Sequence, residues 1–304
     1  MQLQPKRARR CVLSVPGSSE KMMAKAAAIE VDQVLLDLED AVAPNAKEAA
    51  RHKVVEALNT LDWCAKTRCV RINDTQTQWC HDDIIEVVMA AGHNLDTIML
   101  TKTKSPADVQ FLHLLLDQLE LKLELSKRIG IECLIEDVEG LMNVEDIAAS
   151  SDRLEAMTFG MGDYSASQQM HLESVGSTGD YPPDIWHYPR YKMTIACRAF
   201  GLDSVDGPYA DFNDLPAMNR ESKHALTLGM SGKWAIHPSQ AALANEVMSP
   251  SDSEVDRAER ILKAMADAEK TGKGAVSLDG RLIDYASIRQ AEVLIEKVKQ
   301  VATA

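Results

Sequence analysis

The chain has 304 residues, a formal net charge of −13 at pH 7 and 45% hydrophobic residues. This length excludes a small disulfide-stapled module and suits one large α/β barrel or two medium domains. An acidic chain is a poor generic binder of nucleic acid, and no stretch approaches the roughly 18 apolar residues that a membrane span needs.

Six cysteines stand at positions 11, 64, 69, 80, 133 and 197 without a Cys-x-x-Cys pair or a regular spacing. We therefore expect reduced thiols and a cytoplasmic protein. The first residues are basic, but no long apolar segment follows them, so they do not resemble a secretory signal. We expect Lys6, Arg7, Arg9 and Arg10 to form a solvated arm.

Short β-rich runs alternate with helical patterns along the first 240 or so residues. Strands are expected at residues 11–15, 34–38, 69–73, 97–100, 129–136, 156–160, 202–206 and 232–237. No hairpin signal joins consecutive runs, and parallel strands need crossovers, so eight such units predict an α/β fold, a closed (β/α)8 TIM barrel. The alternative is an open doubly wound sheet. That fold favours a Gly-x-Gly-x-x-Gly fingerprint after the first strand, which SVPGSSEK does not match.

The pattern changes near the end of the chain, so we divide it into a catalytic barrel at 1–248 and a helical extension at 249–304. SPSDSE indicates a linker and helix start, and a charged amphipathic helix is expected over about 252–271. A glycine-rich segment that we expect to be flexible follows at 271–287, and a final helix runs to about residue 301. An extension outside the barrel repeats either caps the barrel or packs on a neighbouring subunit.

Catalytic groups of a (β/α)8 barrel lie where its strands end. Glu136 and Asp163 end neighbouring runs and should therefore face the same mouth. Two facing carboxylates need a shared proton or a cation, and oxygen ligands without His or Cys favour Mg²⁺ or Mn²⁺. The alternative for each carboxylate is that it caps the helix that follows.

Two other strand-end residues have alternative interpretations. Arg71 either forms an ion pair with Glu39 or Asp40, or places its planar guanidinium on a substrate carboxylate or a developing enolate. His237 either acts as a general base or fixes its loop, and we favour the second interpretation.

Several motifs in order resemble one family. They are SVPGSSEK, LLDLEDAVAPNAKEAAR, VRIN, the run that ends at Glu136, FGMGDY, GKWAIHPSQ and SPS at 249–251. The chain resembles, over about residues 10–300, the citrate lyase β-subunit-like and malyl-CoA lyase family of the phosphoenolpyruvate/pyruvate barrel superfamily. The stretch 179–214, with DIWHYPR, and the GAV–DG–D pattern at 274–284 are similar to malyl-CoA lyases.

The resemblance implies roles for particular residues. Glu136 and Asp163 match the family's Mg²⁺ ligands, and Arg71 matches the arginine that contacts the substrate's oxygens. Asp40 and Glu39 match an acidic pair near the metal's water shell. Asp284 matches an aspartate on the family's C-terminal lid. In the family this lid reaches the active site of a neighbouring subunit, and its aspartate acts as an acid/base. The candidates for contact with coenzyme A are Ser14, Lys21, Lys25 and Lys233.

The activity that the resemblance implies is a reversible Mg²⁺-dependent carbon–carbon lyase reaction on a β-hydroxyacyl-CoA, with a 2-oxo acid such as glyoxylate as product. A homotrimer or a dimer of trimers is implied too, with no nucleic acid or membrane partner. The alternatives are a citramalyl-CoA lyase or malyl-CoA thioesterase on the same site, a partner-dependent citrate lyase β-subunit, and a silent acyl-CoA-binding homologue. One departure from the family is the fourth strand end. Members often have Leu-Pro-Lys-x-Glu there, whereas this chain has Leu100-Thr101-Lys102-Thr103-Lys104.

Overall fold

The computed structural model describes residues 7–172 and 184–302. Two compact units make up this part of the chain. The first comprises residues 9–248, and the second comprises residues 249–302 together with residues 7 and 8. Each unit is described by itself below.

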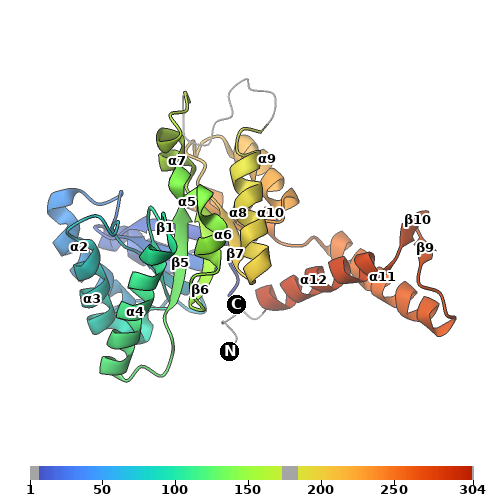
Figure 1. Cartoon of the computed structure of the whole chain (residues 1–304), viewed down its shortest axis with the longest axis horizontal. Coiled ribbons are helices and arrows are strands. Elements are labelled where there is room, and N and C mark those ends of the chain that lie inside the picture. Colours follow the sequence, from blue (N-terminus) through green and yellow to red (C-terminus); the bar gives the residue numbers. More distant parts are fainter. Residues whose placement is uncertain (1–6, 173–183, 303–304) are drawn as a thin grey trace. The chain divides into compact units, whose positions relative to one another are not determined.

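The first unit is built on eight parallel strands that close into a barrel in sequence order, with β8 pairing back to β1. Helices surround these strands (Figure 1). The predicted (β/α)8 TIM barrel is therefore confirmed. The strands are β1 (Cys11–Pro16), β2 (Gln33–Asp37), β3 (Thr67–Arg71), β4 (Thr97–Leu100), β5 (Gly130–Ile135), β6 (Leu154–Phe159), β7 (Asp203–Asp206) and β8 (Gly232–Ala235).

Helices connect each strand to the next on the outside of the barrel. Ser19 caps the first helix, and Ser105 forms a capping box with Asp108 at the fourth. The helices are α1 (Glu20–Ala27), α2 (Lys47–Thr60), α3 (Cys80–Ala91), α4 (Pro106–Leu123), α5 (Val138–Met142), α6 (Val144–Ala148), α7 (Met161–Ser167), α8 (His187–Phe200), α9 (Leu215–Thr227) and α10 (Pro238–Met248), with 3-10 turns at Pro44–Ala46 and Gly92–Asn94.

Side chains fill the barrel interior in layers, because alternate residues of each strand point inward. The middle layer is a separate apolar cluster of Val12, Leu35, Cys69, Met99, Leu134, Val205 and Trp234. Two residues further along their strands, Asp37, Arg71 and Glu136 follow with the same inward orientation. The alternation that fills the core thus also delivers polar groups to the carboxyl end of the barrel.

The opposite end of the barrel is closed by a buried ionic network around Arg9. The guanidinium contacts Glu132 at 3.2 Å, Glu155 at 2.6 Å and Asp203 at 3.0 Å, and Arg9 is only 3% exposed. Arg10 likewise pairs with Asp32. The prediction of a solvated basic arm is therefore wrong for these two arginines, because unpaired carboxylates at the strand starts need buried cations.

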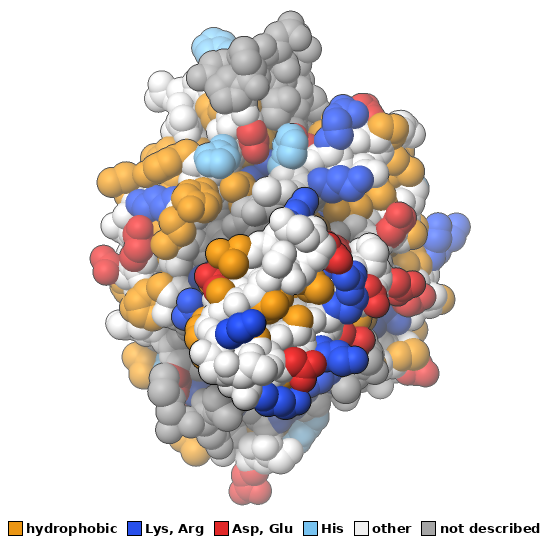
Figure 2. All heavy atoms as spheres, turned by 90° about the vertical axis from the view of Figure 1, so that its right-hand side faces the viewer, with side chains coloured by type: hydrophobic (Ala, Val, Ile, Leu, Met, Phe, Trp, Pro, Cys, Tyr) orange, Lys and Arg blue, Asp and Glu red, His pale blue; other side chains and the backbone are white. Residues whose placement is uncertain are grey.

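The second unit consists of two long helices, α11 (Asp252–Lys270) and α12 (Tyr285–Ala302), which pack against each other. Ser251 and Glu254 form the capping box of α11. Between the helices lies an antiparallel hairpin of β9 (Val276–Leu278) and β10 (Arg281–Ile283). The surface of the second unit carries intermixed Lys, Arg, Asp and Glu side chains (Figure 2).

The hairpin corrects the expectation of a flexible segment at 271–287. Asp279 and Gly280 have φ angles of 51° and 74°, as a two-residue primed turn requires. An Asp-Gly pair between short runs is a hairpin signal that the sequence analysis missed.

None of the helices in the part of the chain that the structure describes has the length and apolar character of a membrane span. All six cysteines are free thiols.

Candidate active site

The polar residues at the carboxyl ends of β2 to β6 converge on one site. Asp37 ends β2, and its carboxylate accepts hydrogen bonds from the backbone N–H groups of Glu39 (2.8 Å) and Ala41 (3.1 Å) in the loop that follows. These bonds fold the loop back sharply. As a result Glu39 and Asp40 stand at the mouth of the barrel rather than continuing along the strand.

Arg71, at the end of β3, is held from several sides. Its guanidinium donates from Nε and Nη2 to the two oxygens of Asp37, at 2.8 and 2.6 Å, and its Nη1 lies 3.0 Å from Glu39. It also lies over the Trp234 ring, 5.2 Å from the ring centroid. Burial alone lowers the pKa of Arg71, but Asp37 and Glu39 raise it above its ordinary value. The guanidinium is therefore charged and fixed in orientation. The predicted alternative of an ion pair with Glu39 is present, and Asp37 is a further partner that holds the guanidinium through two bonds.

Glu136 follows β5 and is 4% exposed. One of its oxygens accepts a hydrogen bond from the backbone N–H of Lys102 at 2.9 Å. The space for its side chain depends on Gly160, where an added Cβ would lie 2.5 Å from Cβ and 2.7 Å from Oε2 of Glu136. The capping alternative does not apply to Glu136, because Asp137 is the residue that caps α5.

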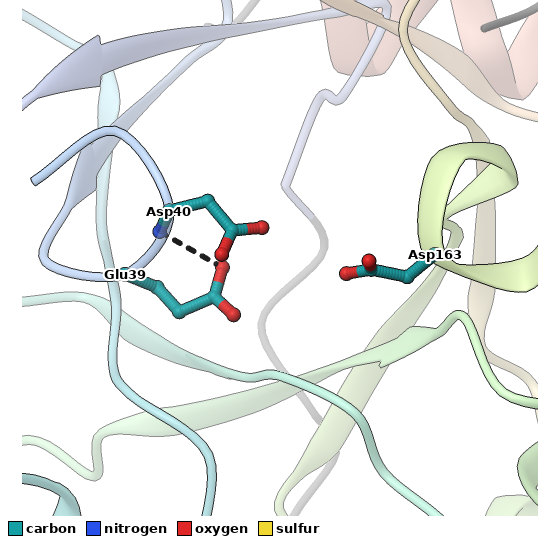
Figure 3. A group of neighbouring side chains, drawn as sticks. All are labelled: Glu39, Asp40 and Asp163. Carbon is teal, nitrogen blue, oxygen red and sulfur yellow. Dashed lines mark hydrogen bonds between the residues drawn. The ribbon is translucent and has the colours of Figure 1, made fainter. Parts of the chain in front are cut away.

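Asp163 lies in the first turn of α7 and points toward Glu39 and Asp40 (Figure 3). One oxygen of each of these three carboxylates lies within 4.8 Å of the others. In addition, the backbone N–H of Asp40 donates to Glu39 at 3.1 Å. The sequence predicted each of these residues as part of the site, and the structure brings them together from β2 and α7.

The cation among these carboxylates is Lys102, which ends the fourth expected run and retains the lysine of the family's Leu-Pro-Lys-x-Glu pattern. The sequence analysis assigned it no specific role in the site. Its ammonium lies 2.5 Å from Glu39 and 2.9 Å from Asp163, and 4.0 Å from both Asp40 and Glu136. Glu136 and Asp163, the predicted ligand pair, thus lie within reach of one positive charge. The position of Lys102 at a strand end was the available signal.

The site carries more negative charge than its buried position favours. The pKa of Glu136 is raised to about 8, chiefly because the side chain is buried. The neighbouring Glu39 and Asp163 also raise this pKa, and Lys102 and Arg71 oppose the rise. Burial also raises the pKa of Glu39. Crowded carboxylates of this kind are stabilised by cations. Because the donors gathered here are carboxylate oxygens, the set fits a hard divalent ion such as Mg²⁺.

The residues predicted to contact coenzyme A differ in their exposure to solvent. Ser14 is half-buried on β1, and Lys21 and Lys25 are exposed one turn apart on α1. Lys233 is fully buried, and its ammonium lies 2.5 Å from Asp206. It is not available to a ligand at the mouth, which corrects the prediction. Beside an apolar barrel wall, the carboxylate of Asp206 needs this charge.

The remaining predicted residues lie elsewhere. Asp284 is exposed in the second unit, where its carboxylate accepts hydrogen bonds from the backbone of Ala286 (2.9 Å) and Ser287 (3.2 Å) and so caps α12. His237 bonds Ser239 and stacks on Phe212, 4.9 Å between ring centroids, which fits the loop-fixing interpretation.

The DIWHYPR stretch contributes to packing. Arg190 is fully buried and bonds Asp206 and Glu221, while Trp186 packs edge-on against Phe159 at 5.8 Å. Residues 179–183 of the same motif region lie outside the described residues.

A (β/α)8 barrel with an acidic cluster and a fixed arginine at the carboxyl ends of its strands defines a class of enzyme rather than a binding module. Comparison with known proteins gives the family. Residues 10–238 match the HpcH/HpaI aldolase/citrate lyase family. The chain belongs to this family, and the predicted resemblance is confirmed.

Two curated relatives and one solved structure show how close the similarity is. The chain is 42% identical to an L-malyl-CoA/beta-methylmalyl-CoA lyase of Cereibacter sphaeroides, covering 98% of this chain and 97% of the relative. It is 34% identical to a malyl-CoA/beta-methylmalyl-CoA/citramalyl-CoA lyase of Chloroflexus aurantiacus, covering 98% and 90%. The crystal structure of CitE from Mycobacterium tuberculosis with magnesium, acetoacetate and coenzyme A is similar at TM-score 0.77 and 27% identity, covering 95% and 98%.

Proposed function

We propose that this protein is a Mg²⁺-dependent carbon–carbon lyase that reversibly cleaves a β-hydroxyacyl-CoA, such as malyl-CoA or β-methylmalyl-CoA, into an acyl-CoA and glyoxylate. The observation that supports this most directly is the cluster of Glu39, Asp40, Glu136 and Asp163 around one cationic position beside Arg71. It stands in a chain that is 42% identical over nearly its whole length to a lyase named for these two thioesters.

Glu136 and Asp163 would hold the metal ion directly, with Glu39 and Asp40 beside its water shell. When bound, such an ion polarises the carbonyl of a 2-oxo acid and stabilises oxygen charge. The same positions accept Mn²⁺, since both ions prefer oxygen ligands. Gly160 and the backbone N–H of Lys102 keep Glu136 directed into the mouth for this role.

In the cleavage direction water takes the proton of the substrate hydroxyl and the hydroxyl carbon becomes the carbonyl of the 2-oxo acid. The carbon–carbon bond breaks, and its electron pair becomes the enolate of the thioester. Arg71 would stabilise charge that develops on oxygen, because its guanidinium is held charged by Asp37. Asp284 would then protonate the enolate carbon, and in condensation it would remove that proton.

Coenzyme A carries several negative charges, whereas the chain has a net charge of −13. Binding therefore depends on local cations, and we propose Lys21 and Lys25 on α1, with Ser14 at the adjacent strand. Because solvent-exposed charges are screened by ions, the affinity should fall as salt rises.

We further propose that the second unit is a lid that delivers Asp284 to the barrel of a neighbouring subunit, in a homotrimer or a dimer of trimers, and that the enzyme works in the cytoplasm. The division of the chain into two compact units supports a tail that can act apart from its own barrel.

The test is a screen of the purified full chain with Mg²⁺ against malyl-, β-methylmalyl-, citramalyl- and citryl-CoA. We expect glyoxylate from the first two thioesters. Pyruvate from citramalyl-CoA as the main product would assign the alternative lyase, and free coenzyme A without oxo acid would assign a thioesterase. Release of no product by the chain alone would contradict the proposal and favour a partner-dependent subunit.

A further inference from the structure

Lys102 occupies an unusual place in the barrel. It follows β4 with a φ of 48°, in the left-handed region that a non-glycine residue seldom adopts. In this conformation its backbone N–H bonds Glu136 at 2.9 Å. Its side chain turns toward the same site, so one residue supplies both a donor and a cation. Backbone strain of this kind persists where surrounding contacts hold it.

The surroundings of the ammonium are almost entirely anionic. Glu39 and Asp163 are its closest partners, and Asp40 and Glu136 stand at 4.0 Å. These four carboxylates follow three different strands, β2, β5 and β6, so their mutual repulsion opposes the closed arrangement. The ammonium among them offsets that repulsion, and Arg71 adds a second positive charge, which forms an ion pair with Glu39 and also acts on Glu136.

Resting on the proposed function, we infer that Lys102 is a built-in counter-ion of the metal site. Without metal it holds the four carboxylates together. When a divalent cation binds, the ion and the Lys102 ammonium share one small cluster, and the repulsion between them lowers the affinity for the metal. Lys102 is thus a positioning residue that sets how tightly the site holds Mg²⁺, rather than a metal ligand, which a protonated amine cannot be.

This inference predicts two effects of opposite sign. Removal of the charge in Lys102→Met should lower the thermal midpoint of the metal-free protein, because the carboxylates lose their partner. The same change should tighten the binding of Mg²⁺ at least tenfold, because the competing charge is gone. A lysine that merely packs, or that binds only substrate, would not tighten the binding of metal alone.

The experiment is calorimetric titration of the full chain with Mg²⁺ alone, without thioester, together with thermal unfolding in the presence of a chelator. Lys104→Met is the matched control. Lys104 lies on the same loop and pairs with Asp137 at 3.4 Å and Glu139 at 4.0 Å, neither of which belongs to the cluster of four carboxylates. We expect its Mg²⁺ affinity to stay at the wild-type value, and Lys102→Arg to stay within about threefold of it. If Lys102→Met does not fold, Lys102→Gln removes the charge and keeps a polar side chain.

Unchanged or weaker Mg²⁺ binding in the charge-removing variants would overturn the inference. Titration of Asp163→Asn separates this failure from failure of the proposed function. If Asp163→Asn loses the metal while Lys102→Met leaves the affinity unchanged, only the role of Lys102 is wrong. If Asp163→Asn binds Mg²⁺ as the wild type does, the metal site itself is wrong, and the inference about Lys102 is overturned with it.

Discussion

Asp96, at the start of β4, shows how one buried carboxylate contributes to stability away from the active site. It accepts hydrogen bonds from Nε and the backbone N–H of Arg68 and from Nζ of Lys127, at 2.8 to 2.9 Å. Burial alone raises the pKa of Asp96, but these partners lower it to about 2. The ionised form is therefore favoured in the folded protein.

The folded pKa of Asp96 lies below the usual value for an aspartate, near 3.9 in an unfolded chain. Its contribution to stability is thus present above about pH 4 and is lost as the pH falls toward 2. We expect Asp96→Asn to lower the free energy of unfolding by about 2 kcal/mol at pH 6, on the order of the shift of the pKa. Urea unfolding at several pH values measures this. A difference from wild type that does not shrink between pH 5 and pH 3 would contradict the assignment.

Individual site residues could be predicted to different degrees. Glu136, Asp163 and Arg71 were found because they end strands, and the position of strand ends in a parallel barrel is a property of the sequence pattern. Asp206 also ends a strand, β7, yet its carboxylate is buried against Arg190 and Lys233. The position of a residue at a strand end does not say whether its side chain faces the mouth or the surrounding helices. Side chains alternate between the two faces of a strand, so a shift of one residue reverses the answer.

Lys102 and Asp37 were missed as functional partners for a related reason. Their contacts join residues 34 and more positions apart, Arg71 to Asp37 and Lys102 to Glu39. Which charges pair across strand ends depends on the register of the closed sheet, which pairs Asp37 with Arg71 directly. The sequence pattern indicated that ionisable residues gather at one end, and the structure was needed to say which of them are partners.

Among the elements, the eight barrel strands were the most predictable part of the fold. Each expected run overlaps an observed strand, with ends that differ by at most two residues. Apolar runs separated by helical patterns are a strong local signal. The β9–β10 hairpin was missed because its strands are short and mostly exposed, so they show little apolar alternation.

The junction between β6 and α7 carries a prediction at the scale of elements. Gly160 allows β6 and β5 to approach so closely that Glu136 fits against its backbone. We expect Gly160→Ala to weaken Mg²⁺ binding at least tenfold, because its Cβ would push the Glu136 carboxylate out of place, and to lower stability by about 1–3 kcal/mol. Titration calorimetry and urea unfolding report the two effects.

Gly274→Ala is the control for this change. A Cβ at Gly274 meets only Tyr285, at 3.8 Å, which is an ordinary contact. It should bind Mg²⁺ like the wild type. Wild-type affinity in Gly160→Ala as well would show that the position of Glu136 does not matter for the metal.

At the scale of the whole molecule, the two units allow the proposed lid to be tested in trans. Asp284→Asn removes the acid/base group and keeps a side chain that can cap α12. Asp163→Asn removes a proposed metal ligand from the barrel and leaves the lid unchanged. Each variant alone should be inactive, and mixed oligomers should recover part of the wild-type turnover, because some sites combine an intact barrel with an intact lid.

Light scattering on the wild type and verified subunit exchange are the controls for this mixing experiment. We expect the mass of a trimer or a hexamer. A monomeric mass, or exchanged subunits without any recovered activity, would mean that the lid does not act on a neighbour.

The most direct measurement of the central claim is the rate of glyoxylate release from malyl-CoA, with Mg²⁺ and after treatment with a chelator, for wild type and Asp163→Asn. The account predicts turnover by the wild type that is lost on chelation and restored by added Mg²⁺. It also predicts a loss of at least a hundredfold in a folded Asp163→Asn. Full activity in the chelated enzyme, or in Asp163→Asn, would contradict it.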